Sequence, residues 1–184
     1  PNQRADRYIS SPRAPAALRS TSEHNRQASE HRKNVHKVKR YPWVLTRNSI
    51  LVTGATSFLA GHFLRCIGDD AAITATRRVD PSIVARGGFD VVVNFSYDRA
   101  LADQPYDPER DPDRILAEAI APLPTHFFML SSRTVYGRGD GSRYKEDAAL
   151  APATPYARNK AETEAFVRHC LGDRATILRL SNIF

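Results

Sequence analysis

Residues 49–65, which read SILVTGATSFLAGHFLR, decide the fold class of this chain. A short apolar run leads directly into Gly54, and a helical apolar pattern follows it. In a dinucleotide-binding fold such a stretch forms a strand, a tight glycine turn and a helix whose N-terminal N–H groups hold phosphate. Only Gly54 stands at the expected glycine spacing, because Ser57 and Ala60 replace the second and third glycines. The loop therefore favours a nucleotide site only modestly over a plain strand–turn–helix connection.

If the loop does bind a dinucleotide, its contacts are expected to come from the turn and the first helical turn. The serine at the second glycine position adds a side chain where the backbone should approach the pyrophosphate closely, so some affinity is expected to be lost. The expected cofactor-binding residues of the loop are Gly54, Thr56, Ser57, Phe58 and Leu59.

Beyond this loop, short apolar runs alternate with helical stretches, which is typical of a parallel α/β sheet. We expect strands at 49–53, 71–76, 90–95, 126–131 and 175–180, and helices at 57–68, 111–120 and 155–171. The near-continuous Val, Ile, Leu and Phe content predicts strands buried on both faces. Residues 48–184 are therefore expected to form a doubly wound, Rossmann-type domain. Between Arg78 and Asp90 there is too little chain for a full helix and an extra strand, so one sheet element is expected to be abbreviated or absent.

The first 47 residues differ from the rest in composition. Residues 1–50 carry 11 Lys/Arg and 3 Asp/Glu, a net charge of +8, whereas residues 51–184 carry 16 and 17, a net charge of −1. Residues 1–47 have few large apolar side chains, so we expect a basic, disordered arm. Such an arm could contact RNA or an anionic surface. A solvated tail is the favoured reading, and we do not expect a nucleic-acid partner.

Two further features bear on the compartment. No apolar run approaches the ~18 residues that span a bilayer, which predicts a soluble protein without a membrane partner. Cys66 and Cys170 lie far apart and match no metal or redox spacing, so we expect no metal site and no disulfide. A reducing cytoplasm is the expected location.

Tyr156 and Lys160 are four residues apart within one expected helix, so they share a face. A tyrosine with its usual pKa near 10 is a poor base at neutral pH, and a neighbouring ammonium stabilises the phenolate. Ser132 is expected at the end of a strand, where an α/β sheet presents its ligands. The alternative is that the pair has only a structural role, with an exposed lysine beside a half-buried tyrosine.

Four segments, in order, resemble the extended short-chain dehydrogenase/reductase family, the NAD-dependent epimerase/dehydratase type that acts on sugar nucleotides. The opening VTGATSFLAGHFLR is similar to its T-G-x-x-G-x-x-G loop, and residues 131–137 (SSRTVYG) closely resemble its S-S-x-x-V-Y-G segment. Residues 152–164 are similar to its P-x-x-x-Y-x-x-x-K-x-x-x-E helix, and residues 179–184 to its R-x-x-N-x-[FY] strand exit. The likeness covers residues 49–184 almost end to end.

The resemblance implies roles for particular residues. Ser132, Tyr156 and Lys160 would form the catalytic proton relay, with Tyr156 and Lys160 also touching the cofactor. Ser132 and Asn182 would contact the substrate, and Tyr136 would form a wall of the site. The strand exit Asn94, Phe95 and Ser96 would lie beside the cofactor. The implied function is a nucleotide-sugar epimerase, dehydratase or reductase in which the nicotinamide carries the hydride.

The expected second strand leads into Arg77 and Arg78, where NAD-preferring relatives usually have an acidic residue. An arginine can pair with the 2′-phosphate of NADP through its two-pronged guanidinium. The cofactor is therefore expected to be NAD or NADP, with NADP favoured. Surface arginines at a strand end are an equally good reading of this pair.

The chain departs from the family where it stops, at Phe184, because the family continues into further strands and a substrate domain. We therefore expect an incomplete Rossmann domain, in which a homodimer or another completing chain covers the exposed sheet. Two alternatives to an active enzyme stay open. One is a non-catalytic module that binds NAD(P) or contacts RNA, and the other is an inactive truncated remnant.

Overall fold

The computed structural model describes residues 48–68, 72–137 and 144–181. The predicted arm and Asn182 lie outside these ranges. The described elements are the strands β1 (Ser49–Thr53), β2 (Ala72–Thr76), β3 (Val91–Asn94), β4 (His126–Ser132) and β5 (Ala175–Leu180), and the helices α2 (Phe58–Ile67), α3 (Pro81–Ala85), α4 (Pro112–Ile120) and α5 (Pro155–Leu171).

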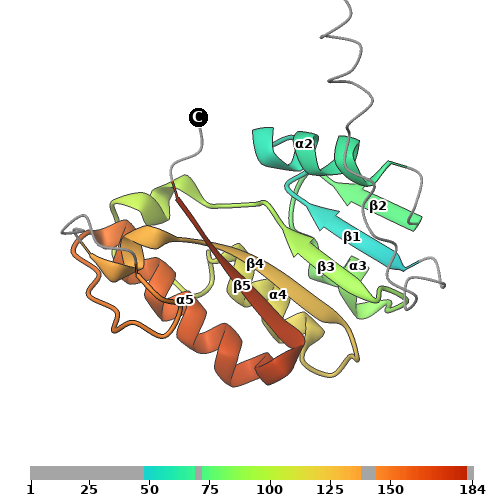
Figure 1. Cartoon of the computed structure of the whole chain (residues 1–184). Coiled ribbons are helices and arrows are strands. Elements are labelled where there is room, and N and C mark those ends of the chain that lie inside the picture. Colours follow the sequence, from blue (N-terminus) through green and yellow to red (C-terminus); the bar gives the residue numbers. More distant parts are fainter. Residues whose placement is uncertain (1–47, 69–71, 138–143, 182–184) are drawn as a thin grey trace, which may run out of the picture. The chain divides into compact units, whose positions relative to one another are not determined.

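The strands form one parallel sheet in the order β2-β1-β3-β4-β5 (Figure 1). From β1 the chain moves outward to β2, then crosses back over β1 to β3 on the opposite side. The ends of β1 and β3 therefore lie next to each other, with Thr53 opposite Asn94. This is the topological switch point at which open α/β sheets bind their ligands. The predicted Rossmann-type fold is confirmed.

The core lies between the sheet and a layer of three helices. Helices α3, α4 and α5 pack side by side, and α2 lies on the other face of the sheet (Figure 1). The central cluster joins Leu51, Val92 and Phe127 of the strands to Leu116 of α4 and Val167 of α5. Each of these side chains is almost completely buried, which holds the carboxyl ends of the strands in fixed register.

The prediction of strands buried on both faces holds for only part of the sheet. In β1 and β3 successive residues are buried, as Leu51 with Val52 and Val92 with Val93 show. In β4 buried residues alternate with half-buried ones, and β5 is half-exposed throughout. The physical reason is that α2 is the helix that covers this second face among the described residues, and it lies over the β1 end of the sheet.

Between Arg78 and Asp90 one sheet element was expected to be abbreviated or absent, and in the described chain it is absent. That stretch contains α3, a helix of five residues that begins after the capping carboxylate of Asp80, and no strand is formed there in the described chain. The short crossover takes the chain directly from β2 to β3.

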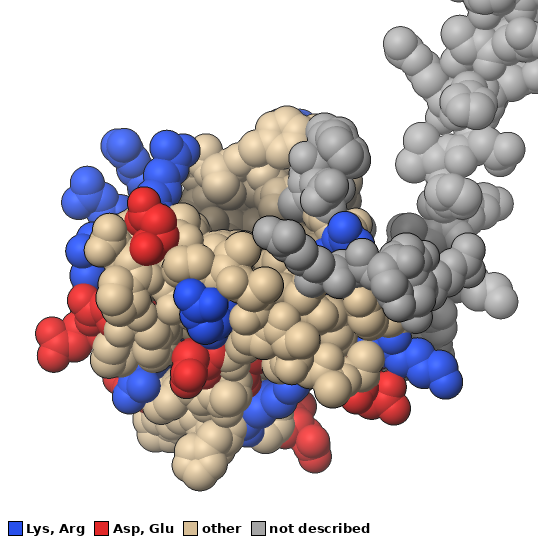
Figure 2. Space-filling view, turned by 90° about the vertical axis from the view of Figure 1, so that its left-hand side faces the viewer, with Lys and Arg blue, Asp and Glu red and all other residues tan. Residues whose placement is uncertain are grey.

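The described surface carries both signs of charge. Figure 2 shows acidic and basic side chains interspersed over the face that it draws. Within the described residues, no helix is both long and apolar enough to cross a membrane.

Candidate functional site

Two adjoining cavities open at the carboxyl ends of β1, β3 and β4. The smaller, of about 400 Å³, is lined by Tyr156 and Lys160 of α5 together with the ends of β3 and β4. The larger, of about 800 Å³, is lined by the loop after β1 and the chain after β2. The residues common to both are Ser57, Phe95, Ser96 and Tyr97. A ligand long enough to fill both cavities would therefore cross the turn that follows β3.

Gly54 makes the turn out of β1. Its φ of +69° lies in the left-handed region, which favours glycine. A Cβ atom at this position would lie 2.5 Å from the backbone nitrogen of Ser96 and 2.6 Å from the carbonyl carbon of Phe95. The next residue, Ala55, donates its N–H to the Thr76 carbonyl at the end of β2 (2.9 Å). The loop after β1 is thus pressed against the ends of both neighbouring strands.

Ser57 begins α2 as its N-cap. Its hydroxyl oxygen accepts a hydrogen bond from the backbone N–H of Ala60 (3.2 Å), and Ala60 is completely buried against the sheet. Phe58 and Leu59 follow in the first turn and line the smaller cavity. Their backbone N–H groups stand where an α-helix offers no internal acceptor. The helix start therefore brings partial positive charge to the site.

Arg77 and Arg78 follow β2 and are exposed in the larger cavity, beside Gly54, Thr56 and Ser57. Their guanidinium groups line the same space as the helix start. Two further arginines, Arg99 and Arg110, line this cavity as well. Arg110 pairs with Asp98 (2.8 Å), so part of its charge is offset.

Ser132 ends β4 and lines the smaller cavity with Tyr156 and Lys160. Its hydroxyl oxygen accepts from the backbone N–H (3.3 Å) and the hydroxyl (3.0 Å) of Thr134, so its own proton remains to be donated. The preceding Ser131 instead donates to the buried carboxylate of Glu164 (2.6 Å). Both serines line the cavity, but the hydroxyl proton of Ser131 is already donated to Glu164, whereas that of Ser132 is not.

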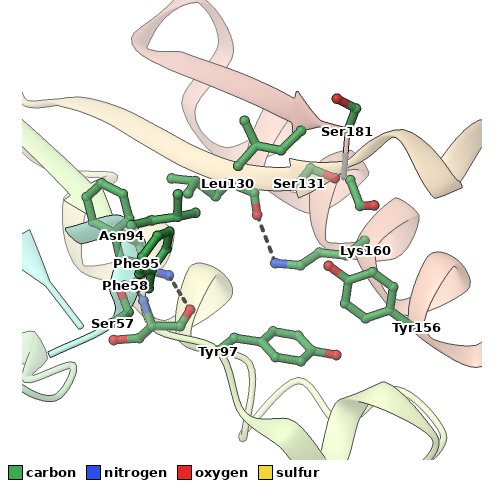
Figure 3. A pocket seen from close by; sticks show the side chains of 14 residues that line it. Ser57, Phe58, Asn94, Phe95, Tyr97, Leu130, Ser131, Tyr156, Lys160 and Ser181 are labelled. Carbon is green, nitrogen blue, oxygen red and sulfur yellow. Dashed lines mark hydrogen bonds between the residues drawn. The ribbon is translucent and has the colours of Figure 1, made fainter. Parts of the chain in front are cut away.

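Tyr156 and Lys160 lie one turn apart at the start of α5. The hydroxyl of Thr154 caps this helix by accepting from the N–H of Ala157 (3.2 Å), which fixes where the helix begins. Both polar ends point into the smaller cavity, with the Lys160 amine directed to the carbonyl of Leu130 (Figure 3). The spacing seen in the sequence therefore places both groups in one cavity.

Lys160 is only 5% exposed and is held by two hydrogen bonds. Its Nζ donates to the Asp113 carboxylate (2.9 Å) and to the Leu130 carbonyl (3.0 Å). Burial acts to lower the pKa of Lys160, but the attraction of Asp113 outweighs it, so the pKa is raised above its usual value. Lys160 is therefore an ammonium at neutral pH.

Sequence reasoning did not find two residues of the site, Asp113 and Tyr97. The ring of Tyr97 packs edge-on against Tyr156, with centroids 5.5 Å apart, and lies 5.0 Å from the Lys160 Nζ. Burial raises the pKa of Tyr97, and the nearby Tyr156 and Asp111 reinforce the shift. Tyr97 directly follows residues 94–96, the predicted strand exit, and this position in the sequence could have indicated it. Asp113 carried no local signal.

Asn94 lines the smaller cavity, but its side chain is 1% exposed and already bonded. Its Oδ1 accepts from the Thr53 hydroxyl (2.6 Å), and its Nδ2 donates to Asp113 (2.6 Å). In contrast, the hydroxyls of Ser96 and Tyr97 are buried without a hydrogen-bond partner among the described residues. Free polar groups of this kind suit a bound polar ligand.

The expectation that Tyr136 forms a wall of this site is wrong. Tyr136 faces a separate cavity, in which its ring stacks on Tyr144 and its hydroxyl accepts from Arg179. Arg179 also makes a buried ion pair with Glu164 (2.6 Å). The tyrosine turns away because this arginine, which comes from β5, holds its hydroxyl on the far side of β4.

Comparison with protein families gives one match over most of the chain. The model of the NAD dependent epimerase/dehydratase family matches residues 50–184. The search of curated proteins found no significant match.

Solved structures of similar fold include several nucleotide-sugar enzymes. The dTDP-4-dehydrorhamnose reductase of Yersinia enterocolitica is 24% identical with a TM-score of 0.62, over 73% of this chain and 52% of that one. A dTDP-4-dehydrorhamnose reductase of Bacillus anthracis, in complex with NADP, is 16% identical with a TM-score of 0.63, over 74% and 54%. UDP-glucuronic acid 4-epimerase of Bacillus cereus, in complex with NAD, is 18% identical with a TM-score of 0.57, over 74% and 57%. The chain spans about half the length of these proteins.

Proposed function

The chain belongs to the NAD dependent epimerase/dehydratase family, and from this premise we propose that it binds NADP(H) and moves a proton at a nucleotide-sugar substrate through Ser132, Tyr156 and Lys160. The observation that carries the proposal is that all three side chains line one cavity. That cavity shares four residues with the one formed by the Gly54 loop and the arginines.

The residues present fit a dinucleotide. The turn at Gly54 leaves no room for a side chain beside Ser96, and this tight turn carries the chain from β1 to the start of α2, whose first residues line the cavities. The unpartnered hydroxyls of Ser96 and Tyr97 lie where the two cavities join, in reach of a polar ligand. Arg77 and Arg78 supply the positive charge that a 2′-phosphate requires, which supports NADP over NAD.

The chain's own contribution to the chemistry is proton transfer and orientation. When a nicotinamide cofactor is bound, it supplies or accepts the hydride. In a reduction, Tyr156 gives its hydroxyl proton to the substrate carbonyl oxygen, and the Ser132 hydroxyl donates a hydrogen bond that holds the same oxygen. The resulting Tyr156 phenolate lies in one cavity with the Lys160 ammonium, which stabilises it until a proton returns from solvent. In an oxidation the same proton moves in the opposite direction.

The substrate class is taken from the solved proteins of this fold, several of which are named for sugars linked to dTDP or UDP. We therefore propose a nucleoside-diphosphate sugar with a carbonyl or hydroxyl group at the reacting carbon. Which reaction is carried out depends on how the sugar is held.

The proposal is tested by replacing Tyr156 with Phe, which keeps the ring and removes the group that moves the proton. Turnover is measured in a protein that joins this chain to the half of its relatives that it does not span. There the turnover of a nucleoside-diphosphate keto sugar, followed by the loss of NADPH absorbance, is expected to fall by about 10²–10⁴-fold. The affinity for NADPH, measured by its fluorescence, is expected to stay within about twofold. Ser132→Ala is the companion variant, with reduced turnover and unchanged NADPH affinity. Full activity in the Phe variant would remove Tyr156 from the mechanism.

A further inference from the structure

The Lys160 ammonium is buried, and burial of an ion costs several kcal/mol unless it is paired. Its two acceptors among the described residues are the Asp113 carboxylate and the Leu130 carbonyl. An ammonium has three N–H donors, so these bonds fix its direction and leave one donor for the cavity. We propose that Asp113 is a positioning residue for the Tyr156–Lys160 pair, which keeps Lys160 charged and aimed at the cavity. This inference rests on the proposed function.

Donors from two different elements hold the side chain of Asp113 in place. It is 1% exposed and lies in the first turn of α4, where the helix end favours negative charge. Its Oδ1 accepts from the Asn94 amide (2.6 Å), its Oδ2 accepts from Lys160 (2.9 Å), and its backbone N–H is capped by Asp111 (3.0 Å). Burial raises the pKa of Asp113, and although Lys160 acts against that rise, the pKa stays above its usual value. Both carboxylate oxygens are therefore occupied by donors.

The same network reaches the loop that we propose to bind the cofactor. Asn94, the partner of Asp113, also accepts from the backbone N–H of Ser96 (2.8 Å). Ser96 lines both cavities and is the residue against which Gly54 is packed. A continuous chain of contacts thus joins the Gly54 turn to Lys160 through Asn94 and Asp113. The position of the ammonium is tied to the shape of the cofactor cavity.

Other groups near Lys160 come from α4, the turn after β3, α5 and β4. From α4 there is Asp111 in addition to Asp113, and from the turn after β3 there is the ring of Tyr97. Its own helix contributes Tyr156, and β4 contributes the uncharged Leu130 carbonyl. Among these groups, Asp113 is the carboxylate bonded to Nζ.

Removing the charge of Asp113 is therefore expected to let burial dominate, and burial lowers the pKa of a lysine. With Asp113 present the raised pKa keeps Lys160 charged through neutral pH. Without the carboxylate, the ammonium persists only below the lowered pKa and is lost as the pH rises through it.

The experiment titrates Lys160 itself in the full chain. The protein has five lysines, so ¹³Cε-lysine labelling gives a small set of NMR signals, and Lys160→Arg identifies the one from Lys160. In Asp113→Asn the Lys160 titration is expected to move down by about 1–3 pH units. Over the pH range in which Lys160 titrates in the variant, NADPH affinity is expected to be independent of pH in the wild type and to weaken with rising pH in the variant.

A matched control comes from the same helix end. Asp111 is as well buried as Asp113 but bonds Tyr106 and Thr163, not Lys160. Asp111→Asn also keeps a residue that caps helices well. This variant is expected to move the Lys160 titration by less than half as much as Asp113→Asn.

One variant guards against loss of the fold. An asparagine at position 113 cannot accept with one oxygen from both Asn94 and Lys160. The double variant Asn94→Asp with Asp113→Asn restores a donor and an acceptor between positions 94 and 113 and an acceptor for Lys160, and it moves the charge one residue further from Nζ. It loses the bond from the Asn94 amide to the Ser96 carbonyl (3.2 Å). Its Lys160 titration is expected to fall between those of the wild type and Asp113→Asn.

Two results would overturn the inference. One is an unchanged Lys160 titration in both the single and the double variant. The other is a lowered titration with NADPH affinity that does not depend on pH, since Asp113 would then not act on the site. If the wild type binds no NADPH at any pH, the proposed function fails, while the lysine titration still decides whether Asp113 holds the charge.

Discussion

Gly54 is the residue at which the fold and the site depend most directly on one side chain. Its positive φ and the Ser96 nitrogen 2.5 Å from where a Cβ would stand both exclude a larger residue. Ser57 and Ala60, which replace the other two expected glycines, are tolerated for physical reasons. Ser57 has a φ of −73° as an N-cap, which any residue can adopt. Ala60 is completely buried, and its single methyl group fits there. The glycine pattern is thus retained where the geometry demands it.

Gly54→Ala is expected to lower the free energy of unfolding by about 1–3 kcal/mol, because it adds both an unfavourable φ and a steric overlap with backbone. The measurement is urea unfolding followed by circular dichroism. Gly61→Ala is the control, since Gly61 lies within α2 and a Cβ there would meet only the flexible end of Arg65 at 3.7 Å. Alanine is favoured over glycine in a helix, so this control is expected to be neutral or stabilising. Equal loss in both variants would contradict the role given to Gly54.

Sequence reasoning found the residues whose partners are near in sequence or stand at element ends. Tyr156 and Lys160 share a helix face, and Ser132 ends a strand, so their meeting in one cavity could be predicted. Asp113 could not be found in this way, because its contact with Lys160 spans 47 residues and depends on how α4 packs against α5. The direction of Tyr136 was missed for the same reason, since Arg179 of β5 decides it.

At the scale of elements, the alternation of apolar runs and helical stretches predicted the boundaries of the long helices to within a residue or two, and in the structure a capping residue precedes each of them. Ser57, Asp111 and Thr154 each precede a helix and accept a backbone hydrogen bond at its start. Helix α3 was not predicted, since its five residues are too few to show helical periodicity. The half-open face of β4 was also missed, because apolar content does not reveal which layer of helices is incomplete.

The cap of α2 allows stability and ligand binding to be separated. Ser57→Ala removes the capping oxygen and is expected to cost about 0.5–2 kcal/mol of stability while leaving NADPH affinity nearly unchanged. Ser57→Asp keeps a capping oxygen but adds a negative charge in both cavities, so stability is retained and NADPH affinity is expected to fall at least about tenfold. Thermal unfolding and NADPH fluorescence titration measure the two effects. Unchanged NADPH affinity in the Asp variant would show that phosphate does not bind at this helix start.

At the scale of the whole molecule, the site follows from the topology. Strand order 2-1-3-4-5 places the ends of β1 and β3 beside each other, and both cavities open there. The phosphate loop, the arginines after β2 and the Tyr156–Lys160 pair come from different parts of the chain and meet only because the sheet is parallel. Residues 51–184 are nearly neutral overall, so the positive charge in the larger cavity is local.

The central claim is that these two cavities form one dinucleotide site with a preference for NADPH, and calorimetric titration of the chain with NADPH and NADH tests it most directly. The account predicts binding of one NADPH per chain, about 10–100-fold tighter than NADH, because a charged hydrogen bond to the 2′-phosphate contributes about 1.5–3 kcal/mol. The double variant Arg77→Ala with Arg78→Ala is expected to bind both cofactors equally. NADH binding as tight as NADPH binding in the wild type would contradict the role of the arginines, and binding of neither would contradict the dinucleotide site itself.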